Sequence, residues 1–337
     1  MKRKFTIAIA ALIGALNIAS SQTNPPTMKA MVVNEFGGPE VLKYQDAPRP
    51  EPKENEILVR VLAAAVNPVD SFVRQGKFIK GNLPLIIGSD IAGIVEKTGA
   101  NAKKFKVGDD VYCYVSVMRG GGYGEFATAR ESETALKPKN ISFEEAAAVP
   151  LAATTAWQAL IDSAKIDSGQ SVLIHGGSGG VGHFAIQIAK SRGAKVIATA
   201  STAHQSTLKQ LGVDQAIDYT TTKFEDVVKD VDLVLNCVRA DALSRSYGVV
   251  KKGGAIVSIT DEPDRAECAK HEIRCSRLGA NPDAKVLEEL AKLIEAGKIK
   301  PIVSQTFPLA EAANAHQQID TRHTLGKIVL KVADAPK

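Results

Sequence analysis

The stretch Ser171-Val-Leu-Ile-His-Gly-Gly-Ser-Gly-Gly-Val-Gly-His-Phe-Ala-Ile-Gln-Ile-Ala-Lys190 joins a short apolar run to a glycine-rich loop and then to a helical pattern. Gly177, Gly179 and Gly182 have the spacing of a dinucleotide fingerprint, in which glycine lets backbone N–H groups approach a pyrophosphate. The N-terminal end of the following helix attracts the phosphate charge. A plain strand-to-helix turn needs one or two glycines, whereas five of the seven residues from 176 to 182 are glycine. The stretch therefore predicts a dinucleotide site formed by Gly176, Gly177, Ser178, Gly179, Gly180, Val181 and Gly182.

Strands and helices alternate after Pro150. Such alternation is typical of a parallel, doubly wound sheet with right-handed crossovers. We therefore assign residues 151–300 to a Rossmann-type cofactor-binding domain. The expected strands are 172–175, 196–200, 216–219, 232–238 and 255–260, and the expected helices are 151–163, 181–192, 205–211, 241–250 and 283–296.

Residues 28–150 have a different pattern, with short strands separated by Gly and Pro. Gly37-Gly38-Pro39 and Gly120-Gly121-Gly122 are two of the breaks. This spacing indicates a compact β domain, barrel-like and partly open. The tail, 301–337, returns to strand, short helix and strand, and we expect it to complete this first domain. The whole chain is thus predicted to be α/β.

Composition limits the class of partner. The 337 residues carry a formal charge of +5, and no basic stripe alternates with aromatic residues, so nucleic-acid binding is not expected. The four cysteines include no CxxC pair and no spacing typical of zinc ligands. We expect them to be small core or surface residues rather than metal ligands or a disulfide framework: Cys113, Cys237, Cys268 and Cys275.

Residues 1–27 have the order of a secretory signal followed by a linker. Lys2-Arg3-Lys4 precedes an apolar run that ends in the small residues Ala19-Ser20-Ser21. The run is too short for a stable membrane span. A real signal predicts a periplasmic or secreted protein. The alternative is a start codon assigned too far upstream, in which case translation begins at Met28 and the protein is cytoplasmic.

Several further segments, together with the glycine loop, carry a resemblance over residues 28–333. In their order and spacing they resemble the medium-chain dehydrogenase/reductase superfamily, specifically its zinc-independent quinone oxidoreductase branch. The resemblance implies a GroES-like β domain packed against a Rossmann domain, with the cofactor in the cleft between them. The segments are Phe36-Gly-Gly-Pro-Glu-Val-Leu42, Ala65-Val-Asn-Pro-Val-Asp70, Gly88-Ser-Asp-Ile-Ala-Gly-Ile-Val95, Ala153-Thr-Thr-Ala-Trp-Gln-Ala-Leu160 and Gly326-Lys-Ile-Val-Leu330.

Zinc ligands are not expected. Zinc alcohol dehydrogenases of the superfamily use a cysteine and a Gly-His-Glu motif in the first domain. This chain has Asn67-Pro68 at the first position and Gly88-Ser89-Asp90 at the second. Ser89 is a poor zinc ligand, and no four-cysteine lobe lies between Val95 and Glu131. The predicted reaction therefore proceeds without a metal.

The strand 195–200 bears on the choice of cofactor. An NAD site usually places Asp or Glu about 20 residues after the glycine loop, but here the strand ends in Ala200-Ser-Thr-Ala-His-Gln205. Hydroxyls tolerate a 2′-phosphate that an acid repels, so NADP(H) is favoured. The resemblance implies that Ser201 and Tyr219 contact this phosphate, with His204 the nearest substitute for the usual Lys or Arg. A helix cap at Ser201 and a packing role for Tyr219 stay open.

The same resemblance places other residues along the cofactor. It implies that Asn67 and Thr155 lie near the nicotinamide ring, and that Arg322 and Lys327 lie near the ribose-phosphate part. The alternatives are a turn Asn before Pro, a Thr facing its own helix, and two solvated basic residues.

A zinc-free hydride transfer suits acceptors that are already electrophilic, such as a quinone or an α,β-unsaturated carbonyl compound. Orientation in a closed cleft and donors aimed at the developing oxygen charge supply the acceleration. The candidate catalytic donors are the Asn67 amide and the Tyr123 hydroxyl, and either Tyr123 or a water supplies the final proton. A structural role is the alternative for Tyr123.

These observations predict a zinc-independent NADPH-dependent reductase of quinones or α,β-unsaturated carbonyl compounds. An enoyl-thioester reductase uses the same donor chemistry and stays open. So does a low-turnover NADPH-binding redox-sensor protein. The expected partners are a small quinone, enone or enal, with no nucleic acid and no stable membrane span; a homodimer is the habit of the family.

Overall fold

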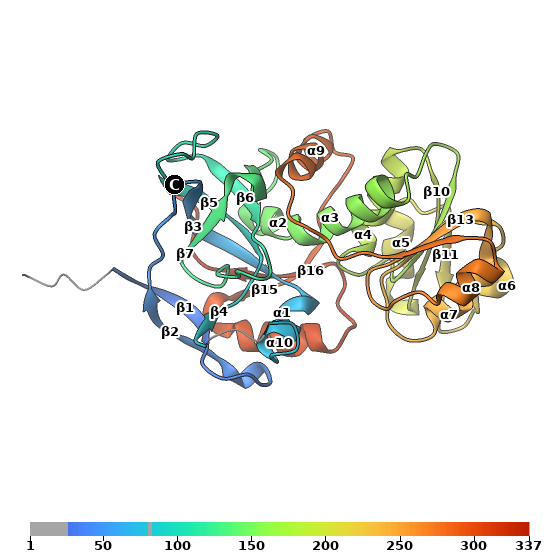
Figure 1. The fold of residues 1–337 in the computed structure, drawn as a ribbon, viewed down its shortest axis with the longest axis horizontal. Helices are drawn as coiled ribbons and strands as arrows, with labels where there is room; N and C mark the ends of the chain where they lie inside the picture. The colour runs from blue at the N-terminus through green and yellow to red at the C-terminus, as the bar shows by residue number, and fades with distance from the viewer. Residues whose placement is uncertain (1–25, 80–82, 337) are drawn as a thin grey trace, which may run out of the picture.

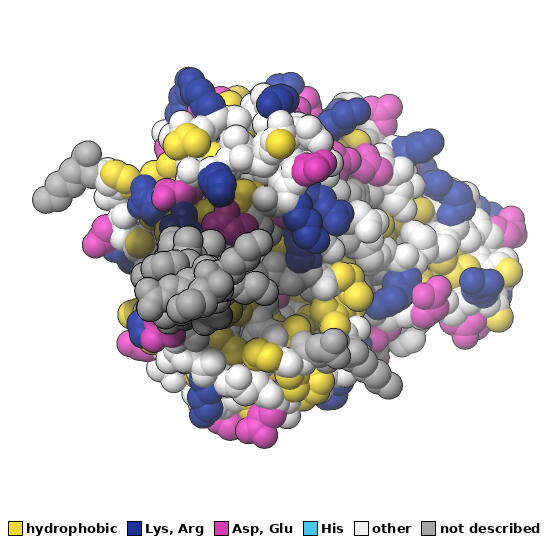
Figure 2. All heavy atoms as spheres, turned by 60° about the vertical axis from the view of Figure 1, so that its left-hand side comes forward, with side chains coloured by type: hydrophobic (Ala, Val, Ile, Leu, Met, Phe, Trp, Pro, Cys, Tyr) yellow, Lys and Arg dark blue, Asp and Glu magenta, His cyan; other side chains and the backbone are white. Residues whose placement is uncertain are grey.

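The computed structural model describes residues 26–79 and 83–336 as two lobes (Figure 1). Of the signal-like segment 1–27, all but the last two residues lie outside this described part, and Thr27 already begins strand β1 (Thr27–Val33). Within the described ranges, no helix is both long and apolar enough to cross a membrane. On the face shown in Figure 2, basic and acidic side chains are interspersed.

The first lobe is built on a seven-stranded sheet that combines strands from residues 56–136 with strands from the tail, residues 303–331. Its strands run in the order β15-β16-β3-β5-β6-β8, with β7 also paired to β3, and β15 and β16 are the parallel pair among antiparallel ones. A small sheet, β2-β1-β4, packs with it. The bounds are β2 (Leu42–Pro48), β3 (Glu56–Val66), β4 (Leu85–Ile86), β5 (Asp90–Thr98), β6 (Asp110–Tyr114), β7 (Phe126–Arg130), β8 (Thr134–Leu136), β15 (Val303–Pro308) and β16 (Lys327–Lys331).

The pairing of β16 with β3 positions the site. The strands are antiparallel, and Val329 lies opposite Ala65 while Ile328 lies opposite Val66. Because β3 ends at Val66, the start of β16 comes beside Asn67, the residue that precedes helix α1 (Pro68–Arg74). Residues about 260 positions apart in sequence are thereby brought into contact, as the bond between Asn67 and Lys327 shows.

The second lobe is a doubly wound, wholly parallel sheet, which confirms the predicted α/β class. The strand order is β11-β10-β9-β12-β13-β14. The chain moves outward from β9 in one direction and from β12 in the other, so the order reverses between β9 and β12. In open sheets of this kind, ligands bind at the carboxyl ends of the strands beside such a reversal. The bounds are β9 (Ser171–His175), β10 (Lys195–Ala200), β11 (Gln215–Asp218), β12 (Val231–Asn236), β13 (Val250–Ser258) and β14 (Arg274–Arg277).

Helices cover this sheet and connect the lobes. Helix α3 (Pro150–Trp157) runs into a π-helical turn, Gln158–Ser163, so the predicted helix 151–163 is continuous but not uniformly α. One apolar core extends from Ala65 of the first sheet through Ala153 of α3 to Ile174 of the second sheet. The other helices are α2 (Phe143–Ala147), α4 (Gly182–Ser191), α5 (Gln205–Gln210), α6 (Phe224–Val227), α7 (Ala242–Ser246), α8 (Arg265–Lys270), α9 (Ala284–Glu295) and α10 (Ala312–Asp320).

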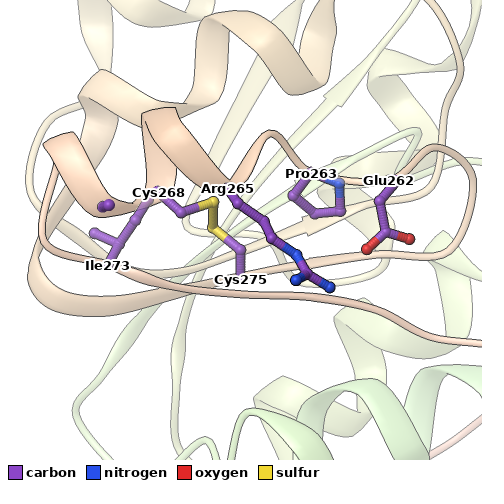
Figure 3. Close-up of a pocket in the computed structure, with 7 residues that line it drawn as sticks. Glu262, Pro263, Arg265, Cys268, Ile273 and Cys275 are labelled. Carbon is purple, nitrogen blue, oxygen red and sulfur yellow. A yellow bond between two sulfur atoms is a disulfide. The ribbon is translucent and has the colours of Figure 1, made fainter.

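The expectation of no disulfide was wrong. Cys268 of α8 and Cys275 of β14 are bonded, with their Cα atoms 6.2 Å apart, a separation that a disulfide spans. The chain reverses between the helix and the edge strand, which brings these two residues together. Figure 3 shows the disulfide beside a surface cavity of about 390 Å³, which residues between 262 and 275 line and no predicted site residue borders.

Candidate active site

The glycine loop turns sharply after β9, and its glycines have two kinds of role. A Cβ on Gly182 would lie 2.1 Å from the Gly176 oxygen, and one on Gly177 would lie 2.8 Å from the Cβ of Ala198. The fold itself therefore requires these two glycines. At Gly179 an added Cβ would meet only the Gly176 oxygen, at 3.3 Å. The space beside Gly179 is thus left open, as close approach of a ligand requires.

Helix α4 begins directly after the loop with its N-terminal end uncapped by a side chain. Four backbone N–H groups donate no hydrogen bond to any acceptor in the described part of the chain: those of Ser178, Gly180, Val181 and Gly182. Open N–H groups and the positive end of a ten-residue helix together suit a pyrophosphate. The predicted loop residues therefore fit a dinucleotide.

His183 anchors this loop, a role that the sequence reasoning missed. Its ring is fully buried; Nδ1 donates to the Gly179 oxygen at 2.9 Å, and Nε2 accepts from the Ile302 N–H at 3.3 Å. Burial lowers the pKa of His183 to about 4, so the neutral ring makes both bonds. The Gly326 N–H also donates to the Ser178 oxygen at 2.8 Å. The tail of the chain thus holds the loop at two points.

Lys327 is buried rather than solvated. It belongs to a buried hydrogen-bonded cluster of Asn67, Asp90 and Lys327, called the Asn67 knot below. Its ammonium donates to Asn67 Oδ1 at 2.5 Å and lies 3.3 Å from Asp90 Oδ2. The Asn67 Nδ2 donates to the same Asp90 oxygen at 2.9 Å. The alternative of a solvated basic residue is therefore wrong, because Asp90 and Asn67 take the hydrogen bonds of the ammonium; a place near the ribose-phosphate part of a cofactor stays a prediction. One N–H of the Asn67 amide remains without a partner among these groups.

The stem of Lys327 connects this knot with the glycine loop. Its Cδ would lie 3.3 Å from a Cβ on Gly180. One lysine side chain therefore reaches from the glycine loop to Asn67, so these two predicted parts of the site lie within the length of one lysine side chain of each other. Burial raises the pKa of Asp90, while the Lys327 ammonium and the Asn67 amide oppose that shift.

Tyr123 lies on the inner side of Asn67 and does not face the cleft. Its side chain has no exposed surface, and its hydroxyl donates to Asp70 Oδ2 at 3.0 Å. The same Asp70 oxygen accepts from the Asn67 backbone N–H at 2.8 Å. A buried hydroxyl that is already engaged cannot donate to a substrate. The candidate catalytic role of Tyr123 is therefore corrected to a positioning role behind Asn67.

A chain of hydrogen bonds continues inward from Tyr123. Its hydroxyl lies 3.2 Å from His316 Nε2, and Arg74 Nη1 lies 2.8 Å from His316 Nδ1. Because Arg74 can only donate, Nδ1 of His316 accepts and Nε2 carries the proton toward Tyr123. Burial and the Arg74 charge lower the pKa of His316 to about 3, and burial raises the pKa of Asp70 to about 7 against the Asn67 and Tyr123 hydrogen bonds.

The Thr155 and Arg322 side chains have the local surroundings of the alternatives, and their places along a cofactor stay predictions. The Thr155 hydroxyl donates within its own helix, to the Leu151 oxygen at 2.7 Å. The Leu151 N–H in turn donates to Asp90 Oδ1 at 2.7 Å, so the helix that carries Thr155 is fixed to the carboxylate that also holds Asn67. Arg322 is exposed in the turn after α10, with φ at +62°.

Ser201 and Tyr219 follow the neighbouring strands β10 and β11, in which Ala200 lies opposite Asp218. Ser201 stands at the N-cap position of the turn Thr202–His204, but its side chain makes no capping bond. Tyr219 is 51% exposed, so it does not have the packing role of the alternative. Both side chains follow the carboxyl ends of these strands, and His204 ends the turn that begins beside Ser201. The pair therefore fits the place of an adenosine phosphate.

Arg239 is a further residue at the junction of the two lobes that the sequence reasoning missed. It lies in the loop after β12, at the strand-order reversal, and its guanidinium carbon lies 5.5 Å from the ring centroid of Phe72 in α1 of the other lobe. Its Nη1 donates to Asp261 Oδ1 at 2.8 Å. The next residue, Ala240, has φ at +79°, a region that favours glycine. The contact joins the two lobes across the crevice.

The positions of the superfamily's zinc ligands hold no ligand set here. Asn67 is engaged as described, and the buried Ser89 hydroxyl has no hydrogen-bond partner in the described part of the chain. Among residues 26–79 and 83–336, no three His, Cys, Asp or Glu side chains gather closely enough to hold a metal ion. An amide and a serine are not donors that zinc prefers.

Comparison with known proteins finds one family model in each part of the chain. The family model described as Alcohol dehydrogenase GroES-like domain matches residues 53–139, and the one described as Zinc-binding dehydrogenase matches residues 211–330. The NADPH-dependent alkenal/one oxidoreductase of Arabidopsis thaliana is 38% identical over 329 residues, which cover 94% of this chain and 82% of the relative. The quinone oxidoreductase of Rattus norvegicus is 35% identical over 331 residues, covering 91% and 99%.

Two solved structures extend the match. The quinone oxidoreductase of Coxiella burnetii has a TM-score of 0.86 at 35% identity, covering 91% of this chain and all of that one. A mycobacterial protein solved in complex with NADPH has a TM-score of 0.83 at 31% identity, covering 90% of this chain and 100% of that one. With the glycine loop, the Asn67 knot and the two-lobed fold, these matches show that the chain belongs to the quinone oxidoreductase branch of the medium-chain dehydrogenase/reductase superfamily.

Proposed function

We propose that this protein is an NADPH-dependent oxidoreductase that transfers a hydride to a quinone or to an α,β-unsaturated carbonyl compound. The observation that carries the proposal is Lys327, whose stem lies against the open glycine loop and whose ammonium holds the Asn67 amide. A phosphate cradle and a polar hydride-transfer site are thereby parts of one crevice. The names of the relatives, an alkenal/one oxidoreductase and a quinone oxidoreductase, support the same acceptors.

The roles of the residues follow from their contacts. The loop N–H groups of Ser178 and Gly180–Gly182 hold the pyrophosphate, and Ser201 and Tyr219 receive the adenosine end. When bound, the reduced nicotinamide supplies the hydride. Lys327 and Asp90 fix the amide of Asn67, which leaves one N–H free to donate to the acceptor oxygen as negative charge develops on it. Since Tyr123 is buried, water supplies the final proton.

Acceptor specificity is tested with the purified full chain. NADPH is mixed with a quinone, an enone or a crotonyl thioester, and oxidation is followed by the loss of nicotinamide absorbance. Faster oxidation with the quinone and the enone supports the proposal. Preference for the thioester favours the enoyl-thioester reductase. Tight NADPH binding without oxidation by any of the three favours the low-turnover binding protein and contradicts the proposal.

We also propose that the protein works in an oxidising compartment, outside the cytoplasm. The signal-like order of residues 1–21 supports this, as does the Cys268–Cys275 disulfide, because such bonds persist where thiols are not kept reduced. Cell fractionation combined with sequencing of the mature N-terminus tests the proposal. A mature chain that begins near Gln22 supports export, and a chain that begins at Met28 contradicts it.

A homodimer is proposed from the family habit alone. Sedimentation velocity of the purified chain, whose monomer mass is 35.7 kDa, measures the assembly directly. A single species of monomer mass at micromolar concentration contradicts the dimer.

A further inference from the structure

The corner that receives the adenosine end contains a carboxylate that the strand pattern did not reveal. No acid follows β10, but Asp218 is the last residue of the neighbouring β11 and lies directly opposite Ala200 in the parallel pair. Ser201 and Tyr219 are the next residues after this pair, and the Tyr219 N–H donates to the Ala200 oxygen at 3.2 Å. Asp218 therefore ends its strand next to both residues that would contact a 2′-phosphate: it precedes Tyr219 in the chain and pairs with the residue before Ser201.

The nearby hydroxyls are turned toward this carboxylate. The Thr202 hydroxyl donates to Asp218 Oδ2 at 2.6 Å. The Thr220 hydroxyl and backbone N–H donate to Asp218 Oδ1 at 2.6 and 3.0 Å. These hydrogen bonds lower the pKa of Asp218, so it is ionised at neutral pH. The hydroxyls of Thr202 and Thr220, which could otherwise donate to a phosphate, thus donate to the Asp218 carboxylate instead.

Asp218 is not paired with a basic side chain in the part of the chain that the structure describes: it takes part in no ion pair with a lysine, arginine or histidine there. Gln205, which opens helix α5, is turned inward, because its Nε2 donates to the Ala200 oxygen at 2.9 Å and to the Ile217 oxygen at 3.1 Å. A 2′-phosphate at this corner therefore meets a fixed negative charge, whereas a ribose 2′-hydroxyl meets an acceptor.

We propose that Asp218 is a specificity-determining residue that weakens recognition of the 2′-phosphate, so that this enzyme also accepts NADH. The inference rests on the proposed function, since it concerns the same cofactor crevice. Asp218 acts at one end of that crevice and leaves the hydride-transfer site around Asn67 unchanged. Its effect is thus confined to cofactor binding.

The test uses Asp218→Asn and two nucleotide probes that lack nicotinamide. Asn keeps the side-chain oxygen that accepts from Thr220, since Asn and Asp form the same turn, but it removes the charge. Dissociation constants for 2′,5′-ADP and 5′-AMP are measured by calorimetry. We expect D218N to bind 2′,5′-ADP about tenfold more tightly, with little change for 5′-AMP. Glu262→Gln, which removes an equal charge beside the α8 cavity, is the control and leaves both constants unchanged.

A second measurement varies the ionic strength. Added salt screens repulsion between exposed charges, so the affinity of the wild-type chain for 2′,5′-ADP relative to 5′-AMP rises with ionic strength, and this rise is smaller in D218N. If D218N folds poorly, Asp218→Ser removes the same charge. A nucleotide ratio that is the same in wild type and variant overturns the inference. Wild-type protein that binds neither probe nor NADPH instead overturns the proposed function, which separates the two failures.

Discussion

Gly179 is the loop residue at which a side chain would displace a ligand rather than disturb the protein. An added Cβ meets only the Gly176 oxygen at 3.3 Å, so Gly179→Leu is expected to fold. We expect it to raise the dissociation constant for NADPH more than about tenfold, because the side chain fills the space that a pyrophosphate needs. Nicotinamide fluorescence titration measures the constant.

The matched control at this loop is Gly182→Ala. Here the Cβ would lie 2.1 Å from the Gly176 oxygen, so the loss appears first as a lower midpoint of thermal unfolding. Unchanged NADPH affinity in a folded G179L protein would show that the pyrophosphate does not use this loop.

Lys327 is expected to stabilise the fold in addition to holding the Asn67 side chain in place. Lys327→Met leaves the Asp90 carboxylate buried without its cationic partner, and breaking a buried pair in this way costs about 3–5 kcal/mol. The free energy of unfolding in urea measures this cost. Asp90→Asn combined with K327M removes both charges, so the double variant is expected to be more stable than K327M alone. Equal free energies of unfolding for K327M and the double variant would mean that a buried Asp90 carboxylate without Lys327 has no cost.

Single residues also show where sequence reasoning ends. The glycine loop was predictable because the spacing of glycines carries the backbone geometry directly. Lys327 was placed near the cofactor by the family resemblance, and Tyr123 was a candidate donor to the substrate because it carries a hydroxyl beside the glycines of residues 120–124. Their side chains point inward because Asp90 and Asp70 are buried there, and a partner from another strand leaves no mark in the local pattern.

At the scale of elements, the α8–β14 pair is the part that the pattern missed. Both elements are short, and β14 reads Arg-Cys-Ser-Arg with neither an apolar run nor an alternation of apolar residues, whereas β9 and β10 have clear apolar runs. Edge strands are exposed along one side, so hydrophobic periodicity is weak there. The disulfide depended on that missing pair and could not be predicted without it.

The disulfide is expected to stabilise this edge of the sheet. It closes a loop between residues seven positions apart, for which chain entropy gives about 2–3 kcal/mol. Cys268→Ser with Cys275→Ser should lower the free energy of unfolding by about that amount, and a reducing agent should lower it similarly in the wild type. The reducing agent should have no effect on the double variant. A wild-type stability that does not respond to the reducing agent would argue against the bond.

At the scale of the whole molecule, the C-terminal residues 301–331 contact both lobes. Strand β16 completes the first sheet, while the residues just before β15 and β16 bond to the glycine loop through His183 and Ser178. Arg239 adds a contact across the crevice to Phe72. The relative placement of the glycine loop and Asn67 is therefore set by long-range contacts, which explains why the local sequence pattern could not predict the geometry between the two lobes.

Buried ionisable groups make the stability of the whole fold depend on pH in two opposing ways. Burial lowers the pKa of His175 and His183 to about 4 and that of His316 to about 3. For a base with a lowered pKa, the stabilisation is present above its unfolded value of about 6.5 and is lost as the pH falls toward the folded value. Asp70 acts in the other direction: its raised pKa, about 7, gives a stabilisation that is present below about pH 4 and lost as the pH rises toward 7.

Two variants separate these contributions. His175→Gln removes one histidine whose partners are Thr199 and Ser246, far along the chain from the Asn67 knot. Between about pH 4.5 and 6.5 it should flatten the rise of unfolding free energy with pH by about 1.4 kcal/mol per unit, the effect of one proton. Asp70→Asn should steepen the same rise, because it removes the opposing carboxyl. Urea unfolding at a series of pH values measures both slopes, and slopes parallel to that of the wild type in both variants would mean that neither group titrates differently in the folded and unfolded chain.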